Sequence, residues 1–351
     1  MLKKCKTAAL LAAFAILTVS LTGCGKASSS SEIVSKKKAY THEIFAMDTY
    51  MTMKIYGGGD GVLVKAEKRI QALEEELSVN RKNSDIWNIN KNAGSEVKIS
   101  VDTRTILRKA AEISDKTGGA LDITLYPVIC EWGFTTGDYK IPEPEKLTAL
   151  LRHVDYRNVG ISGRSVMIPE NCGIDLGALA KGYTGDELIR VFSSRGVESA
   201  IINLGGNVQT LGTKPDGSKW KVAIRDPFDI EEDICTVEVE SKAVITSGNY
   251  ERYFTGEDGK DYWHIIDPTD GYPADNGLVS VTIIGESGID CDALSTALFV
   301  MGKDKAIEFC RSNTDIDAVL VSDDKAIYYT EGIADCFTNL SDMSTEVIRC
   351  A

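Results

Sequence analysis

The most informative stretch of the chain is residues 174–183, with the sequence IDLGALAKGY. It places one carboxylate, two glycines and one ammonium at the start of an expected helix. Glycines let a backbone approach a ligand closely, and the first N–H groups of a helix are free to bind phosphate. Asp175 could therefore hold a ligand hydroxyl and Lys181 a phosphate. A surface salt bridge between the two would fit the segment equally well.

A second stretch, DCDALST at residues 290–296, supplies oxygen ligands at helical spacing. Asp292 and Thr296 are four residues apart, so they project from the same face of a helix. One carboxylate, one hydroxyl and a loop carbonyl suit Mg²⁺, which takes its other ligands from phosphate and water. The spacing also fits Asp290 and Asp292 as caps of a helix at 290–301. Together the two stretches indicate a site for a phosphorylated ligand and a hard divalent cation.

The N-terminal residues have the pattern of an export signal. Residues 1–23 contain three lysines and then an apolar run, and LTGC spans residues 21–24. This pattern predicts a cleaved signal peptide, too short for a lasting membrane span. LTGC resembles a bacterial lipobox, which predicts lipidation of Cys24; an ordinary secretory signal with a chance cysteine is the alternative. Residues 24–40 predict a flexible tether. The domain at 41–351 would then lie on the extracytoplasmic side of the bacterial plasma membrane.

The composition argues against several classes of protein. A formal net charge of −13 disfavours nucleic acid as a partner, and no basic patch follows the tether. Of the nine cysteines, Cys5 and Cys24 belong to the leader and the lipid site, which leaves an odd number and no Cys-x-x-Cys pair. A full disulfide framework and a structural zinc site are therefore not expected. The motifs of serine hydrolases and of dinucleotide-binding folds are also missing.

Hydrophobic periodicity predicts helices and strands in mixed order. The expected helices cover residues 62–78, 103–117, 145–152, 180–195, 290–301 and 303–312. The expected strands cover residues 51–56, 166–168, 200–204, 220–225, 234–239, 243–247, 262–266, 278–284, 317–321 and 326–330. Because no regular βαβ rhythm appears, we predict an α+β fold in a single large domain.

His264 is one of three histidines and is expected on a strand that leads into a Pro/Gly loop. A histidine with a nearby carboxylate is the usual general base at neutral pH, and Asp267 is close in the sequence. A histidine that merely makes a hydrogen bond within a strand is the simpler interpretation.

Seven separated segments, in this order, resemble the ApbE family of lipoproteins, the FAD:protein FMN transferases. The resemblance runs from about Thr41 to Arg311. Its segments are FAMDT at 45–49, GGALD at 118–122, WGF at 132–134, IDLGALAKGY at 174–183, NLGG at 203–206, HIIDP at 264–268 and DALSTA at 292–297.

The resemblance implies an α+β fold that holds FAD in a cleft, with Mg²⁺ on its pyrophosphate. The residues that it implies for the FAD site are Met47, Ala120, Leu121, Asp122, Asp175, Lys181 and Ile266. It implies metal ligation by the carbonyl of Ala178 and the side chains of Asp292 and Thr296, so Asp292 is expected to be a ligand and not a helix cap. His264 falls where the family has a histidine proposed to activate the acceptor.

Two positions depart from the family pattern. Asp48 stands where the family often has glycine, and Asn80 stands in the FAD site where many members have a tyrosine that could stack on the flavin nucleotide. Losing an aromatic platform costs about 1–3 kcal/mol of binding in comparable stacks. Looser FAD binding, or readier transfer to water, would follow.

The resemblance implies that a threonine hydroxyl of a partner flavoprotein attacks FAD, giving protein-bound FMN and AMP. The family points to exported or membrane electron-transfer flavoproteins as acceptors. Two alternatives stay open: a Mg²⁺-dependent FAD pyrophosphatase that uses water, and a non-catalytic, lipid-anchored flavin or solute receptor.

Overall fold

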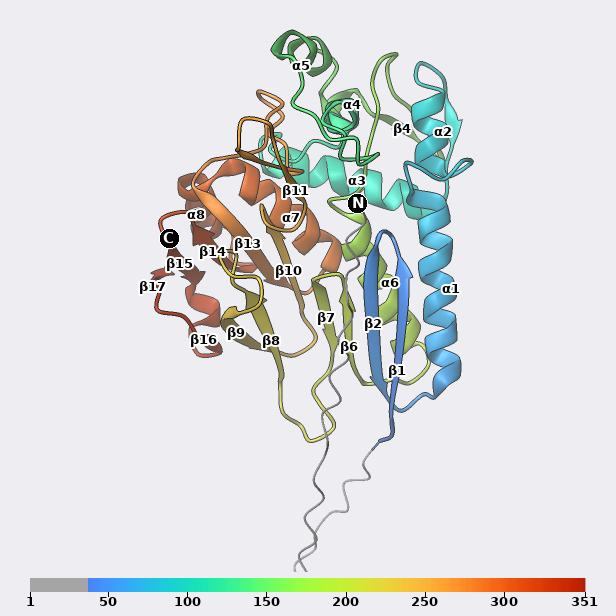
Figure 1. Ribbon diagram of the computed structural model, residues 1–351. Coiled ribbons are helices and arrows are strands. Elements are labelled where there is room, and N and C mark those ends of the chain that lie inside the picture. The colour runs from blue at the N-terminus through green and yellow to red at the C-terminus, as the bar shows by residue number, and fades with distance from the viewer. Residues whose placement is uncertain (1–36, 351) are drawn as a thin grey trace, which may run out of the picture. The chain divides into compact units, whose positions relative to one another are not determined.

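A nine-stranded sheet is the centre of the structure, a computed structural model that describes residues 37–350 (Figure 1). Neighbouring strands are antiparallel except for the parallel pair β15 and β17. The strand order places the first strand of the chain at one edge and the last at the other. In spatial order the strands are β1 (Ala39–Ala46), β2 (Thr49–Tyr56), β6 (Ser199–Leu204), β7 (Asn207–Leu211), β10 (Ala243–Gly248), β13 (Leu278–Gly285), β14 (Asp317–Ser322), β15 (Ala326–Thr330) and β17 (Ser344–Ile348).

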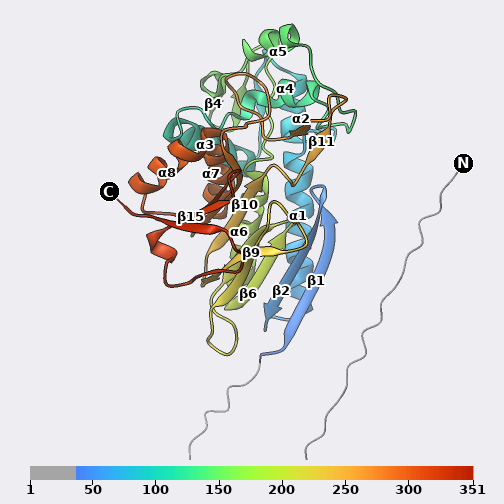
Figure 2. The ribbon, with the colours of Figure 1, turned by 60° about the vertical axis from the view of Figure 1, so that its left-hand side comes forward.

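Helices cover one face of this sheet, and in both views α1 runs beside the β1–β2 hairpin (Figures 1 and 2). Side chains alternate between the two faces of each strand because successive Cβ atoms point to opposite sides. In β10, Ala243 and Ile245 join the core under the helices, whereas Val244 joins the core on the other face. The helices are α1 (Asp60–Leu77), α2 (Asp85–Lys91), α3 (Val101–Lys116), α4 (Tyr126–Glu131), α5 (Pro144–Leu151), α6 (Ala180–Ser193), α7 (Gly288–Met301) and α8 (Lys303–Ser312).

Smaller sheets complete the fold. A three-stranded sheet covers part of the second face, where Trp220 and Val237 pack with Val244 in one core. Its strands are β16 (Phe337–Asn339), β9 (Asp233–Val239) and β8 (Trp220–Arg225). A second three-stranded sheet consists of β3 (Val97–Lys98), β5 (Ser165–Met167) and β4 (Gly160–Ser162), and β11 (Tyr253–Thr255) pairs with β12 (Asp261–Trp263). The α+β prediction is confirmed, since helices and strands follow each other in irregular order around a mainly antiparallel sheet.

All six predicted helices are present, with ends within two residues of the expected positions. One predicted strand is wrong in extent: residues 262–266 were expected to be continuous, but β12 ends at Trp263 and Ile266 makes only an isolated bridge to Pro273. The chain turns there because Asp267 N donates to Tyr272 O at 2.8 Å and closes a short loop. The missed elements are the short helices α2 and α4 and the strands β1, β3, β4, β7, β11, β16 and β17.

Several predictions fall on residues that the structure does not describe. The signal peptide at 1–23, Cys24 and residues 24–36 of the tether lie outside the described range. Within residues 37–350, no helix is both long and apolar enough to cross a bilayer. The seven cysteines in that range are all unpaired thiols, and Cys172, Cys235, Cys291 and Cys310 are buried as small apolar side chains.

Candidate active site

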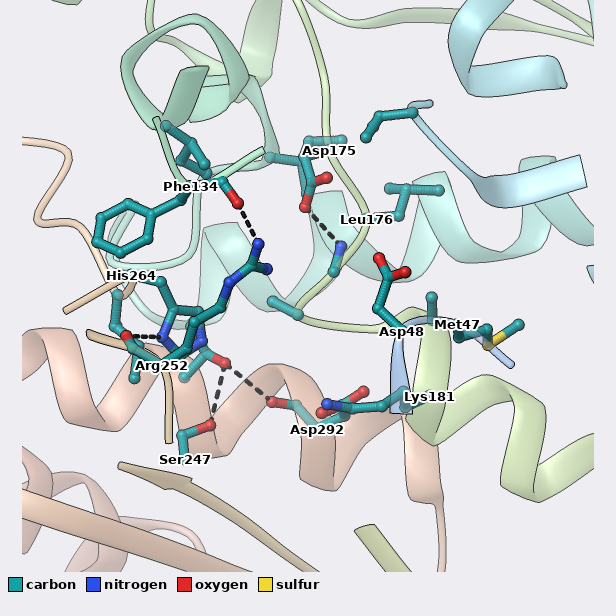
Figure 3. A pocket seen from close by; sticks show the side chains of 18 of the residues that line it. Met47, Asp48, Phe134, Asp175, Leu176, Lys181, Ser247, Arg252, His264 and Asp292 are labelled. Atoms are coloured by element: carbon teal, nitrogen blue, oxygen red, sulfur yellow. Dashed lines mark hydrogen bonds between the residues drawn. The ribbon is translucent and has the colours of Figure 1, made fainter. Parts of the chain in front are cut away.

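A cavity of about 770 Å³ lies at the end of the sheet where the β1–β2 and β6–β7 turns meet the last residues of β10. Figure 3 shows side chains from distant parts of the sequence converging on it. The residues that the sequence analysis assigned to FAD, metal and catalysis all line this cavity. They are Met47, Asn80, Ala120, Leu121, Asp122, Asp175, Ala178, Lys181, His264, Ile266, Asp292 and Thr296.

The loop before α6 is held in place by its backbone. The side chain of Asn90 makes two hydrogen bonds with the backbone of Ile174: Nδ2 donates to Ile174 O at 2.8 Å, and Oδ1 accepts from Ile174 N at 2.7 Å. Asp175 N donates to Ile123 O at 2.9 Å, and Asp175 Oδ1 accepts from Gly177 N at 2.7 Å. These bonds fix the segment that carries Asp175 and the carbonyl of Ala178 along the cavity wall.

The first turn of α6 contacts α7 with almost no space between the backbones. A Cβ at Gly182 would lie 2.6 Å from Asp292 Cβ and would also overlap the carbonyl oxygen of Gly288. Gln209 Nε2 donates to Gly182 O at 3.0 Å, and Gly182 N donates to Asp292 Oδ2 at 2.8 Å. Glycine is therefore required at position 182 so that Asp292 can reach the start of α6.

The structure contradicts the interpretation of Asp290 and Asp292 as helix caps. α7 starts at Gly288 and its N-cap is Ser287, whose hydroxyl accepts from Asp290 N at 3.4 Å. Asp292 lies one turn inside the helix and is only 5% exposed, with its carboxylate in the cavity. Burial raises the pKa of Asp292, and the ammonium of Lys181 opposes the shift.

Thr296 lies one helical turn after Asp292 and faces the same cavity. Its Oγ1 lies 3.2 Å from Ser247 Oγ and 3.4 Å from Asp292 O. Ala178 lies just before α6. If the helix began earlier, the carbonyl of Ala178 would accept a hydrogen bond from Gly182 N, but Gly182 N donates to Asp292 instead. No group of three or more His, Cys, Asp or Glu side chains suited to a metal ion occurs in residues 37–350. The predicted set has one carboxylate, one hydroxyl and one carbonyl.

Asp175 and Lys181 do not form the salt bridge that the sequence left open, because no ion pair joins them within residues 37–350. Lys181 instead lies beside Asp292, as Figure 3 shows. Burial raises the pKa of Asp175, and the guanidinium of Arg252 partly offsets this. The two carboxylates thus each have a different cation as neighbour.

His264 directly follows β12 and is half-buried at the cavity. Its Nδ1 lies 3.2 Å from the carbonyl oxygen of Arg252, which can only accept, so Nδ1 carries the proton and Nε2 has a free lone pair. Burial lowers the pKa of His264 to about 4, and Arg252 and Lys181 add to this effect. The expected carboxylate partner is not Asp267, whose Oδ1 accepts from the Thr269 amide and hydroxyl.

Arg252 is the main site residue that the sequence analysis missed. Its guanidinium extends across the cavity between His264 and Asp175 and donates to the carbonyl of Phe134 (Figure 3). One feature of the sequence could have indicated Arg252: it is a charged residue that follows the buried strand β10. β10 ends at the same end of the sheet as the Gly205-Gly206 turn. Arg252 and Lys181 together give the cavity two cations.

Met47 and Asp48 form the two-residue turn between β1 and β2, with φ of 49° and 58°. Positive φ at both central positions is typical of a type I′ turn, where Asn, Asp and Gly are preferred at such positions. Asp48 therefore keeps the turn that glycine would make, and adds a carboxylate to the cavity wall. Met47 N donates to Glu74 Oε1 at 3.1 Å, which ties the turn to α1.

The remaining predicted residues differ in how they face the cavity. Asn80 is exposed at its rim, next to Ser78 Oγ, which accepts from Asn80 N at 3.2 Å. Asp122 organises its own loop, because Oδ1 accepts from Thr124 N at 2.8 Å and Oδ2 from Tyr156 N at 3.0 Å. Ala120, Leu121 and Ile266 form apolar lining.

Comparison with known proteins shows the family of the chain. The model of the ApbE family matches residues 47–320. An FAD:protein FMN transferase of Klebsiella pneumoniae is 32% identical over 90% of this chain and 99% of its own length. One of Treponema pallidum is 31% identical over 91% of this chain and 93% of its own length. The crystal structure of an ApbE protein from Thermotoga maritima, 31% identical, superposes with a TM-score of 0.79 over 84% of this chain and 98% of its own. The chain therefore belongs to the ApbE family.

Proposed function

We propose that this chain is an FAD:protein FMN transferase that moves FMN from FAD to a threonine hydroxyl of a partner flavoprotein and releases AMP. The observation that carries the proposal is the meeting of Lys181, Asp292, Thr296 and His264 in one cavity of a chain whose relatives bear that name. The volume of about 770 Å³ is in the range of cofactor-sized sites.

Lys181 and Arg252, two of the cations that line the cavity, provide charge for the pyrophosphate of FAD. Lys181 lies in the first turn of α6, where the helix dipole also favours an anion. Arg252 projects from the opposite side and offers planar, paired N–H donors to phosphate oxygens. A phosphate between them would be neutralised from two directions.

The oxygen donors around Asp292 fit Mg²⁺. The buried carboxylate of Asp292, the hydroxyl of Thr296 and the carbonyl of Ala178 are hard ligands, and a cation would offset the desolvation that raises the pKa of Asp292. When bound, Mg²⁺ would neutralise the pyrophosphate and stabilise charge that develops on the departing AMP.

His264 is the proposed general base. Its lowered pKa keeps Nε2 unprotonated at neutral pH, so it can accept the proton of the threonine hydroxyl as that oxygen attacks the FMN-side phosphorus. A phosphorus–oxygen bond to threonine forms, the bond to the bridging oxygen breaks, and AMP leaves with that oxygen. The Nδ1–H bond to the Arg252 carbonyl holds the ring in the required tautomer.

The setting of the reaction is part of the proposal. The leader and LTGC sequence support a chain lipidated at Cys24 and anchored on the extracytoplasmic side of a bacterial plasma membrane. The acceptor would then be an exported or membrane electron-transfer flavoprotein. The net charge of −13 speaks against a nucleic-acid partner.

FAD hydrolysis to FMN and AMP is the second candidate activity, and Asn80 favours it. An exposed amide at the rim gives the flavin nucleotide no stacking surface there, so the bound nucleotide would be held less firmly and be more open to water. The same machinery serves both reactions, and only the acceptor differs. A binding protein without turnover would bind FAD and release no AMP.

The test compares the wild-type protein with Asp292→Asn. We expect AMP release from FAD and Mg²⁺, in-gel flavin fluorescence on an acceptor domain, and loss of both by at least about 100-fold in the variant. Mg²⁺ alone should raise Tm by a few degrees in the wild type and not in the variant, because only a ligand that binds the native state stabilises it.

Asp290→Asn is the matched control, since Asp290 lies on the same helix but pairs with Lys109 at 3.0 Å outside the cavity. It should retain both activities. AMP without a labelled acceptor would favour hydrolysis, and FAD binding without AMP would favour the binding protein.

A further inference from the structure

Two exposed aromatic rings stand next to the cavity. Phe45 on β1 lies directly opposite Tyr50 on β2, and their ring centroids are 5.1 Å apart in an edge-to-face arrangement. Phe45 is 63% exposed and Tyr50 is 80% exposed. Their strand neighbours Ala46 and Met51 point into the core instead, so the rings occupy the solvent face of the hairpin. Large aromatic side chains exposed as a pair are typical of interaction surfaces.

The position of this pair ties it to the active site. Phe45 and Tyr50 flank the turn whose residues Met47, Asp48 and Thr49 line the FAD cavity. The pair therefore stands at the edge of the cavity, next to its lining turn.

A groove continues from the cavity along β1. It has a volume of about 490 Å³ and lies between residues 44–46 of the edge strand and α1. Its polar lining consists of Glu67, Gln71, Glu74, Glu75 and Arg81, and Glu74 and Arg81 belong to both the groove and the cavity.

The groove has an excess of negative charge. Glu74 pairs with Arg81 at 2.6 Å and Glu67 contacts His42 at 2.8 Å. Glu75 is exposed and forms no ion pair with any residue from 37 to 350. Phe45 also lines the groove, so one ring of the pair borders its carboxylates. This surface is complementary to a segment that carries an apolar side chain next to a Lys or Arg.

We propose that Phe45, Tyr50 and this acidic groove form the docking surface for the acceptor protein, an inference that rests on the proposed transferase function. The occupant is an extended segment of the acceptor with an apolar residue against the rings and a basic residue near Glu75. The surface is continuous with the cavity, so a bound segment leads its neighbouring threonine toward His264. Aromatic residues dominate the binding energy of many interfaces.

Charge favours an acceptor over the other possible occupants. Anionic lipid headgroups would meet the carboxylates of the groove, and a second copy of the chain would bring another net charge of −13. The carboxylates of the groove and the net negative charge of the chain both attract a basic acceptor segment.

The experiment measures initial flavinylation rates against the concentration of a soluble flavoprotein domain that the wild-type chain labels. We expect Phe45→Ala with Tyr50→Ala to raise the acceptor KM at least about tenfold, with KM for FAD and acceptor-free AMP release changed less than about twofold. Glu75→Gln should raise the acceptor KM by a few fold, and added salt should weaken that difference.

Matched controls remove similar groups elsewhere. Phe228 is 40% exposed in the β8–β9 loop, and Glu346 is exposed on β17 at the far edge of the sheet. Phe228→Ala and Glu346→Gln should leave the acceptor KM unchanged.

An unchanged acceptor KM in the double variant would overturn the docking surface and leave the transferase intact. The same holds if the double variant changes only the dimerisation of the chain or its vesicle binding. A wild-type chain that releases AMP but labels no acceptor would overturn the proposed function, and the docking surface with it. Unchanged FAD kinetics in the variants shows that they are folded.

Discussion

The two sides of the cavity are built in opposite ways. On the inner side, α6 and α7 touch through Gly182 and Gly288, and Asp292 and Gln209 are buried and hydrogen-bonded between them. On the outer side, Asn80 is exposed, His264 is half-buried and the hairpin tip carries exposed rings. Packing therefore fixes Asp292 and the start of α6, whereas the side chains of the rim are open to solvent. In the proposed transferase, the groups that bind the pyrophosphate and the groups that meet the acceptor lie in different parts of the cavity.

The largest expected effect tests whether the outer side also carries chemistry. His264→Ala should lower the rate of FMN transfer roughly 100- to 10,000-fold, because it removes the only proposed base. FAD binding, followed by flavin fluorescence, should change little. His153→Ala is the control, since His153 lies in the loop after α5 and does not line the cavity. Full transfer by His264→Ala would remove His264 from the mechanism.

The next prediction concerns the inner side alone. Gly182→Ala should lower the free energy of unfolding by about 3 kcal/mol, because the new methyl group meets backbone and not a movable side chain. Urea unfolding measures this. Gly61→Ala is the control: no atom lies within 4 Å of a Cβ built at that position in α1, so no loss is expected. Equal stability of both variants would show that the α6–α7 contact is loose.

A smaller effect is expected at the rim. Asn80→Tyr should lower KM for FAD roughly tenfold, because a ring restores a stacking surface. The ratio of transfer to hydrolysis should rise at the same time. Asn80→Ala should resemble the wild type, since among residues 37–350 Asn80 makes a hydrogen bond through its backbone N–H alone. A KM that rises in Asn80→Tyr would mean that the amide itself contacts the substrate.

The smallest expected effect is in the pH profile. Because the pKa of His264 is lowered to about 4, kcat/KM for the free enzyme should stay nearly flat from pH 7 to pH 5 and fall below that. A base with the ordinary pKa of about 6.5 would lose roughly 25-fold in rate over the same range. The native ring binds a proton less tightly than the unfolded chain does, so its contribution to stability is complete above about pH 6.5 and lost toward pH 4. A limb near pH 6.5 would contradict the structure.

Sequence reasoning predicted the inner side better than the rim. The spacing of Asp292 and Thr296 on a helix, and of Asp175 and Lys181 around a glycine turn, is local and survives in the fold. The packing of α6 against α7 joins residues about 110 positions apart in the sequence, and local spacing does not predict it. The helix-cap and salt-bridge alternatives could therefore not be excluded without the structure.

Arg252 was missed for a similar reason. Its position depends on how the chain turns after β10 and on the carbonyl of Phe134, more than 100 residues earlier. The edge strand β1 was missed because Glu43 and His42 interrupt its apolar pattern, and only pairing with β2 makes it a strand.

The direction of β1 has a practical consequence for handling the protein. Its eight residues begin at Ala39 and end beside the cavity turn, which puts the two ends roughly 25 Å apart at the usual rise of a strand. A bead or sensor surface coupled through the chain before Ala39 pulls on the end remote from the substrate opening. Immobilisation in that orientation leaves the cavity end of the sheet facing the solution, where the proposed acceptor can reach it.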